Sequence, residues 1–184
     1  MIRFARVEDA QAILDIYAPV VRDTIISFEI EPPTPDEMRE RVRKTLATHP
    51  WLVYEHNGRV AGYAYASRHR DRLAYQWSVD VACYVHPRFR AQGIGKRLYR
   101  ALLALLKRQG FQCAYAGIAL PNDASVGLHE SVGFRRIATY HEVGYKQGAW
   151  RDTGWWECRV GDAPPNPAPP LPPQGLGAGI LDDL

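Results

Sequence analysis

The stretch from Cys83 to Arg97 constrains the fold of this chain more than any other. An apolar run ends at Val85, a short basic turn with glycines at positions 93 and 95 follows, and a helical pattern then continues to Gly110. The first turn of a helix has unpaired backbone N–H groups and a partial positive charge, and glycines let an anion approach those groups closely. The sequence therefore predicts an anion site where a strand meets a helix.

The basic side chains at this turn indicate the kind of anion. They are Arg88, Arg90, Lys96 and Arg97. Their number favours a ligand with several phosphates over a lone carboxylate. Two familiar phosphate motifs do not fit: a P-loop needs Lys followed by Ser or Thr, whereas Arg97 follows Lys96, and the dinucleotide fingerprint needs a third glycine where Leu98 stands. The remaining Arg-x-x-Gly-x-Gly pattern is a weak signal alone. It becomes informative together with the preceding apolar strand, which contains the carboxylate Asp80.

Composition narrows the class of protein. The formal net charge of +3 is well below that of a protein with the clustered basic stripe of a nucleic-acid binder. The three cysteines, Cys83, Cys113 and Cys158, are far apart and odd in number, which is typical of reduced thiols rather than of a disulfide framework or a zinc site. No signal peptide and no apolar run of membrane-spanning length is evident. We expect a cytoplasmic protein without metal, nucleic-acid partner or membrane partner.

Local patterns predict an alternation of strands and helices. The strands are expected at 2–7, 51–55, 59–67, 77–85, 113–120, 136–145 and 155–160, and the helices from Asp9 to an interruption at Pro19, at 34–48, after Gly93 to Gly110, and at 122–132. Two signals are especially clear. Thr34-Pro35-Asp36-Glu37 has the residues of a helix start with a capping box, and Asn57-Gly58 is typical of a tight hairpin turn.

The carboxyl-terminal segment differs from the rest of the chain. Seven prolines fall within ten residues after Ala163, and three glycines follow. Such composition cannot build a packed core. We therefore expect a folded domain over residues 1–160 and a disordered tail over residues 161–184.

Several motifs together resemble one enzyme superfamily. Arg90-Ala91-Gln92-Gly93-Ile94-Gly95 after a strand ending in Tyr84-Val85 resembles the acetyl-CoA signature of the GNAT superfamily of N-acetyltransferases. Further segments resemble its phosphinothricin, methionine sulfone and methionine sulfoximine acetyltransferase subfamily: Ile26–Phe28, Trp77–Asp80, Leu120–Ser125, Leu128–Glu130 and Gly144–Asp152. The resemblance spans about residues 1–159. It implies an α/β fold with a mixed, mostly antiparallel sheet of about seven strands, flanked by helices, in which strands four and five splay apart.

The resemblance also implies a donor site. Acetyl-CoA would enter between strands 77–85 and 113–120, with its pyrophosphate on the turn and its pantetheine arm beside the end of the first strand. The candidate cofactor-binding residues are Cys83, Tyr84, Val85, Arg90, Ala91, Gln92, Gly93, Ile94, Gly95, Lys96, Asn122 and Ser125. Two alternatives stay open: the glycines could merely turn the chain into a helix, and Asn122 could be a simple helix cap.

Acetyl transfer needs a neutral amine, so a base is required. Asp80 matches the position where the subfamily usually has Glu; because aspartate is shorter, we expect it to act through a water molecule, unless it is a buried carboxylate satisfied by a neighbouring Arg or backbone N–H. His129 matches the position of a second proposed acid or base, where many relatives have tyrosine. It could also be an ordinary histidine on a short helix.

The acceptor site depends most on the resemblance, which indicates Phe28, Arg72 and Tyr75 beside Asp80. An amino acid needs an apolar wall and a cation for its acidic group. We therefore expect an enzyme that acetylates the amine of a small amino-acid-like molecule by direct attack, and similarity to the family implies a homodimer. Two other functions stay open: acetylation of another small amine or a protein terminus, and acyl-CoA sensing without catalysis.

Overall fold

The computed structural model describes residues 1–176 and 181, and within them the chain forms one seven-stranded mixed sheet. The strand order is β1-β2-β3-β4-β5-β7-β6. The strands are β1 (Ile2–Phe4), β2 (Trp51–His56), β3 (Arg59–Arg68), β4 (Ser78–Val85), β5 (Cys113–Ala119), β6 (Arg135–Lys146) and β7 (Ala149–Arg159). The α-helices are α1 (Ala10–Asp23), α2 (Pro35–Leu46), α3 (Ile94–Gln109) and α4 (Asp123–Glu130). The predicted fold class is confirmed.

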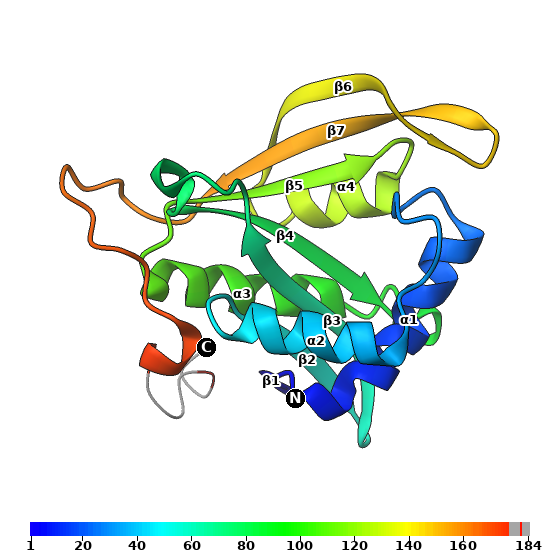
Figure 1. Ribbon diagram of the computed structural model, residues 1–184, viewed down its shortest axis with the longest axis horizontal. Helices are drawn as coiled ribbons and strands as arrows, with labels where there is room; N and C mark the ends of the chain where they lie inside the picture. The colour runs from blue at the N-terminus through cyan, green and yellow to red at the C-terminus, as the bar shows by residue number, and fades with distance from the viewer. Residues whose placement is uncertain (177–180, 182–184) are drawn as a thin grey trace.

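Helices cover both faces of the sheet (Figure 1). On one face α3 buries Leu98, Leu102 and Leu105 against the strands. On the other, α1 and α2 bury an apolar cluster that includes Ile13 and Val42. Both helical patterns follow from apolar residues spaced three or four apart. The two core clusters fix the sheet between the helix layers.

The pairing of β4 with β5 is parallel and short. It runs only from Ser78 opposite Cys113 to Asp80 opposite Tyr115. Beyond Asp80, β4 continues to Val85 paired with β3, whereas β5 continues to Ala119 paired with β7. The predicted splay between the fourth and fifth strands is therefore confirmed, and it opens a gap in the sheet at these strand ends.

The clearest local signals are confirmed. The Thr34 hydroxyl accepts a hydrogen bond from the Glu37 backbone N–H at 3.2 Å, and the Glu37 carboxylate accepts one from the Thr34 N–H at 2.7 Å. The hairpin between β2 and β3 turns at Asn57 and Gly58, with φ angles of 49° and 73°. The long helix ends at Gly110 with φ of 96°. Each of these features depends only on neighbouring residues.

Two predicted helix details were wrong. Helix α1 passes through Pro19 and ends at Asp23, because Val20 and Val21 are buried on its inner face and the loss of one backbone hydrogen bond does not end it. The Asp9 side chain does not cap α1. Its carboxylate instead accepts hydrogen bonds from the Arg3 guanidinium at 2.7 and 2.8 Å.

Several strand bounds also differ from the prediction. Strand β7 begins at Ala149 rather than near residue 155, because a turn at Gln147 and Gly148 pairs it with β6 in one long hairpin. Strand β1 ends at Phe4 rather than at residue 7, where a short 3-10 helix, η1 (Val7–Asp9), begins. Three more such helices follow: η2 (Leu73–Tyr75), η3 (Pro87–Phe89) and η4 (Pro173–Leu176).

The first part of the predicted tail contacts the folded domain. Gln109 donates a hydrogen bond to the Leu171 carbonyl at 2.6 Å and accepts one from the Leu171 N–H at 2.8 Å through its own backbone carbonyl. The Trp77 indole donates to the Ala168 carbonyl at 2.9 Å, and Pro173 is buried. Prolines suit this extended path because they have no N–H to satisfy. Residues 177–180 and 182–184 of the predicted tail lie outside the described residues.

Among residues 1–176 and 181, no helix combines the length and the apolar character that crossing a membrane requires.

Candidate active site

A pocket of about 350 Å³ lies where β4 and β5 separate. Its lining comprises Val20, Ile26, Cys83, Tyr84, Val85, Phe89, Arg90, Ala91, Gly93, Ile94, Gly95, Lys96, Asn122, Ala124, Ser125 and Leu128. It therefore brings together every predicted cofactor-binding residue except Gln92. The Gln92 amide instead donates to the Arg88 carbonyl at 3.3 Å, on the outside of the turn.

The turn before α3 leaves the start of this helix open. Gly93 is the N-cap residue with φ of 75°, and no side chain caps the helix there. A Cβ on Gly93 would meet nothing within 4 Å, so the backbone angle and not crowding favours glycine. Gly95 has a different role: a Cβ there would lie 2.9 Å from a Leu128 methyl, so glycine lets α3 approach α4. Residues 93–96 of this uncapped helix start line the pocket, and free N–H groups at a helix start favour anions.

The basic residues of the turn divide into two groups. Arg90 and Lys96 line the pocket. Arg97 instead reaches toward β2, where its guanidinium donates to the Tyr54 hydroxyl at 3.0 Å. The sequence placed all four basic residues at one site, whereas the structure separates Arg88 and Arg97 from it.

The end of β4 and the start of α4 form two walls of the pocket. Cys83 is desolvated, which raises the pKa of its thiol to about 12 and keeps it protonated. Asn122 does cap α4, since its side chain accepts from the Ser125 N–H at 3.2 Å, and it also lines the pocket. Helix capping and pocket lining are thus compatible in this residue.

Asp80 lies at the last pair of the β4–β5 ladder. Its carboxylate is 2.7 Å from His69 Nδ1, and the Asp80 side chain is 35% exposed. Burial raises the pKa of Asp80, although the hydrogen bond from His69 acts in the opposite direction. The sequence left open that a neighbouring Arg or backbone N–H satisfies Asp80. In the structure the partner is instead a histidine, His69. The sequence analysis missed His69, although the β3–β4 register, with Ser67 opposite Asp80, could have indicated it.

Aromatic side chains surround His69. Its ring stacks on Tyr115 with 4.6 Å between ring centroids, and the rings of Tyr75 and Trp155 approach at 6.1 and 6.3 Å. Tyr75, predicted for the acceptor site, therefore lies beside His69, which in turn contacts Asp80. Arg72 is the N-cap residue of η2, the short helix that carries Tyr75. The Arg72 side chain is exposed and makes no hydrogen bond or ion pair with any residue that the structure describes.

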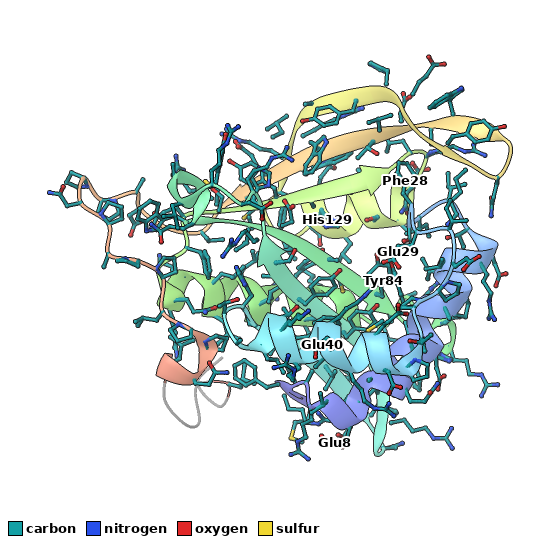
Figure 2. All side chains as sticks on the ribbon, viewed as in Figure 1. Glu8, Phe28, Glu29, Glu40, Tyr84 and His129 are labelled. Atoms are coloured by element: carbon teal, nitrogen blue, oxygen red, sulfur yellow. The ribbon has the colours of Figure 1, made fainter. Side chains whose placement is uncertain are left out.

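His129 projects from α4 into the molecule and is only 5% exposed (Figure 2). Its Nδ1 lies 2.7 Å from the Ser125 carbonyl, so Nδ1 carries the proton, and Nε2 accepts from the Tyr99 hydroxyl at 2.7 Å. Burial lowers the pKa of His129 and favours the neutral ring. His129 and Tyr99 both line a small cavity of about 50 Å³ between β4 and β5.

The loop between α1 and α2 reaches the opening from the helix layer (Figure 1). Ile26 of this loop lines both the pocket and the inner cavity. Phe28 lies beside the end of β5 (Figure 2), and its ring occupies the space where a side chain at position 144 would be. Phe28 thus lies near the end of β5, whereas Tyr75 lies beside His69 near the start of β4 and β5.

Lys146 anchors this loop and is only 6% exposed. Its ammonium donates to the backbone carbonyls of Val21, Ser27 and Glu29 at 2.7, 2.6 and 2.8 Å. One side chain of β6 therefore connects the end of α1 to the residues on both sides of Phe28. Among the described residues, no group of three or more His, Cys, Asp or Glu side chains is placed to hold a metal ion.

Comparison with known proteins agrees with this geometry. Residues 12–134 match the acetyltransferase (GNAT) family. The chain belongs to this family. A phosphinothricin N-acetyltransferase from Streptomyces viridochromogenes is 40% identical over 171 residues, which cover 92% of this chain and 93% of that protein. An L-methionine sulfoximine/L-methionine sulfone acetyltransferase from Salmonella typhimurium is 33% identical, covering 86% of this chain and 94% of the relative.

The fold of this GNAT-family protein is also similar to that of a solved structure. The crystal structure of a phosphinothricin acetyltransferase from Sinorhizobium meliloti in complex with AcCoA has a TM-score of 0.87 and 32% identity, covering 91% of this chain and 92% of that one. The enzyme class predicted from the sequence, an N-acetyltransferase, is therefore confirmed.

Proposed function

We propose that this protein transfers acetyl from acetyl-CoA to the amine of a small amino-acid-like acceptor of the phosphinothricin or methionine sulfone/sulfoximine type. The observation that carries the proposal is the opening between β4 and β5, which has an uncapped helix start at one side and Asp80 at its inner end. The names of the relatives and the AcCoA complex of the Sinorhizobium meliloti protein support this donor and this acceptor class.

The donor half of the pocket fits acetyl-CoA in shape and charge. The pyrophosphate would bind the free N–H groups of residues 93–96, together with Arg90 and Lys96. Beyond Asp80, the edge of β4 that faces β5 has no strand partner among the described residues. The amide groups of the pantetheine arm would pair with the backbone of residues 83–85 there, as an added strand does.

The chemistry is direct transfer without an acyl-enzyme intermediate. An ammonium group of the acceptor first loses a proton, and the nitrogen lone pair then forms a bond to the thioester carbonyl carbon. The carbon–sulfur bond breaks, the nitrogen gives up its second proton, and the thiolate of CoA takes up one proton. Asp80 is the proposed base, since burial raises its pKa toward the range in which a carboxylate accepts protons efficiently.

His129 is the second candidate for proton transfer. Because both ring nitrogens already have protein partners, it could deliver a proton to the thiolate only after the bond to Tyr99 opens. The lowered pKa of His129 also makes it a weak proton carrier at neutral pH. We therefore propose that the main role of His129 is structural: it holds Tyr99 and α4 beside the inner cavity.

The acceptor would lie between the Asp80 end of the opening, where Tyr75 is, and the open strand ends, where Phe28 is. Phe28 and Tyr75 supply apolar walls, and Arg72 at the rim supplies a cation for the acidic group of the acceptor. The loop that carries Phe28 is fixed by Lys146, so the apolar wall is preformed. A preformed wall loses little conformational entropy on binding, which favours a small ligand.

The decisive experiment measures CoA release with phosphinothricin, methionine sulfone, methionine sulfoximine and common amino acids as acceptors. We expect turnover with at least one of the first three. The Asp80→Asn variant should lose about 100-fold or more in kcat near neutral pH, as for other general bases, and recover partly at alkaline pH, where more of the amine is neutral. Tight acetyl-CoA binding without turnover on any amine would instead identify an acyl-CoA sensor.

The sign of the pH dependence follows from the role of the carboxylate. A base must be deprotonated to act, so activity should rise as pH increases through the raised pKa of Asp80. This rise in activity forms the acid limb of the pH profile, and it should disappear in Asp80→Asn. An unchanged pH profile would remove Asp80 from the mechanism.

We also propose that the protein is a cytoplasmic homodimer. Its cysteines, Cys83, Cys113 and Cys158, are free thiols, which suits a reducing compartment. The β6–β7 hairpin exposes an apolar surface of the kind that subunits bury. This surface consists of Ile137, Tyr140, Val143, Tyr145 and Trp150. Sedimentation velocity tests the assembly: a dimer is expected at micromolar concentration, and a Val143→Glu variant should dissociate it.

A further inference from the structure

His69 and Asp80 form a pair that has the geometry of a histidine base and its orienting carboxylate. Nδ1 of His69 is 2.7 Å from Asp80 Oδ1, and the His69 side chain is 14% exposed. No described residue forms a hydrogen bond with the other ring nitrogen, Nε2. One nitrogen is thus fixed by a carboxylate while the other remains open to a ligand.

The surroundings hold the imidazole in one orientation. The ring stacks on Tyr115 of β5 at 4.6 Å, while Tyr75 of η2 and Trp155 of β7 approach its edges. The charged groups that act on the pair are few: Asp80 itself on β4 and Arg70 on the same loop as His69. Tyr115 and Tyr75 are the other titratable neighbours of the ring. A neutral ring can therefore keep Nδ1–H on Asp80 and leave the Nε2 lone pair free.

We propose that the base function assigned above to Asp80 is carried out through His69: His69 takes the proton and Asp80 orients its ring. This inference rests on the proposed function. Nε2 of His69 takes the first proton from the acceptor ammonium, and the carboxylate of Asp80 stabilises the resulting imidazolium through Nδ1–H. The neutral nitrogen then attacks the thioester carbon, the carbon–sulfur bond breaks, and the second nitrogen proton goes to the CoA thiolate. The imidazolium finally releases its proton to water, which restores the neutral ring.

Two physical reasons favour the pair over Asp80 alone. Oδ1 of Asp80 already interacts with His69 Nδ1 at 2.7 Å, whereas Nε2 of His69 has no hydrogen-bond partner among the described residues. A carboxylate that holds Nδ1–H also stabilises the imidazolium that forms when the other nitrogen takes a proton, as in other histidine–carboxylate pairs.

In the alternative role, His69 only holds Asp80 in place, and Asp80 itself takes the proton from the acceptor. The His69→Asn variant separates the two roles. Its amide nitrogen lies near the place of Nδ1 and can still donate to Asp80, but it has no atom that accepts a proton in place of Nε2. If the variant fails to fold, as judged by its thermal melt, His69→Gln takes its place and the same two outcomes apply.

We expect His69→Asn to lower kcat by about 100-fold or more, as removal of a general base does, with the Kd of acetyl-CoA unchanged. The acid limb of kcat/KM should disappear, and the double variant with Asp80→Asn should be no slower than the slower single variant. A kcat within about threefold of the parent with the acid limb intact would overturn the proposal and leave Asp80 as the base.

A matched control lies on the hairpin surface. His141 Nδ1 is 2.9 Å from Asp152 Oδ2, a pair of similar geometry whose histidine is 77% exposed. His141→Asn should leave kcat and its pH profile unchanged. The parent protein is assayed first with the acceptor panel: failure of all acceptors contradicts the proposed function, whereas normal turnover with a fully active His69→Asn contradicts only the inference about His69.

Discussion

The donor half and the acceptor half of the proposed active site are built in different ways. Most of the donor half comes from one continuous stretch, residues 83–96, with Gly93 in the left-handed region, and Asn122 and Ser125 at the start of α4 complete it. The acceptor half comes from side chains on three distant segments: the α1–α2 loop, the β3–β4 loop and the β6–β7 hairpin. Its parts are joined by the Lys146 ammonium and by the His69–Asp80 pair.

This difference indicates how each half tolerates change. Backbone donors do not depend on side-chain identity, so apart from Arg90, Lys96 and the close contact at Gly95, substitutions near the turn should alter the donor half mainly where they alter its φ angles. The acceptor half depends on individual side chains, so single substitutions there should change which molecule is accepted while donor binding remains. Four experiments test this separation.

The largest effect is expected at Lys146. In Lys146→Met three backbone carbonyls lose a charged donor, so the free energy of unfolding should fall by about 2–4 kcal/mol, and KM for the acceptor should rise as the Phe28 loop loosens. Urea denaturation and steady-state kinetics measure both. The control, Lys44→Met, removes an exposed ion pair with Glu40 and should cost less than about 1 kcal/mol. Equal costs for the two variants would show that the Lys146 contacts add nothing.

Arg72→Gln tests the cation of the acceptor half. Loss of one charged hydrogen bond, about 1.5–3 kcal/mol, should raise KM for an acidic acceptor about 10- to 100-fold while the Kd of acetyl-CoA stays constant. Arg68→Gln, in the same basic region, is the matched control and should leave KM unchanged. A parallel rise in KM for both variants would indicate a general effect of charge rather than a specific contact.

Gly93→Ala tests the donor half. A side chain at φ of 75° costs about 1–2 kcal/mol, and a turn that relaxes to avoid this cost moves its N–H groups, so the Kd of acetyl-CoA should rise about 5- to 30-fold. Gly58→Ala introduces the same strain at φ of 73° in the β2–β3 hairpin and should leave this Kd unchanged. Isothermal titration calorimetry measures both. If acceptor KM rises instead, the two halves are not separate.

Removal of residues 164–184 should have the smallest effect. The hydrogen bonds of Gln109 and Trp77 to the tail would be lost, which should lower the free energy of unfolding by about 1 kcal/mol. We expect kcat and both KM values to stay unchanged, because neither pocket nor inner cavity is lined by tail residues. Loss of soluble protein would contradict a folded domain of residues 1–160.

The sequence predicted those features that neighbouring residues determine. The capping box at Thr34 and the turns at Asn57-Gly58 and Gly93 depend on local hydrogen bonds and φ angles, and the GNAT resemblance supplied the splayed sheet. Residues whose partners lie far along the chain were misread or missed. Lys146 contacts Val21 across 125 positions. Asp9 was misread for a different reason, because Arg3, only six positions away, binds its carboxylate and it does not cap its helix. His69 appeared only as part of a basic loop because its role depends on the register of β3 against β4.

The short β4–β5 ladder has a consequence for the mechanics of the whole protein. Strands β1 to β4 form one antiparallel unit and β5, β7 and β6 another. Within the described part of the chain, only the three residue pairs from Ser78 to Asp80 join the two units in the sheet. A ligand seated in the opening would extend this seam and tie the two units together. Binding of acetyl-CoA should therefore slow hydrogen exchange in β5 and β7 as well as around α3, and raise the melting temperature in proportion to the logarithm of its concentration.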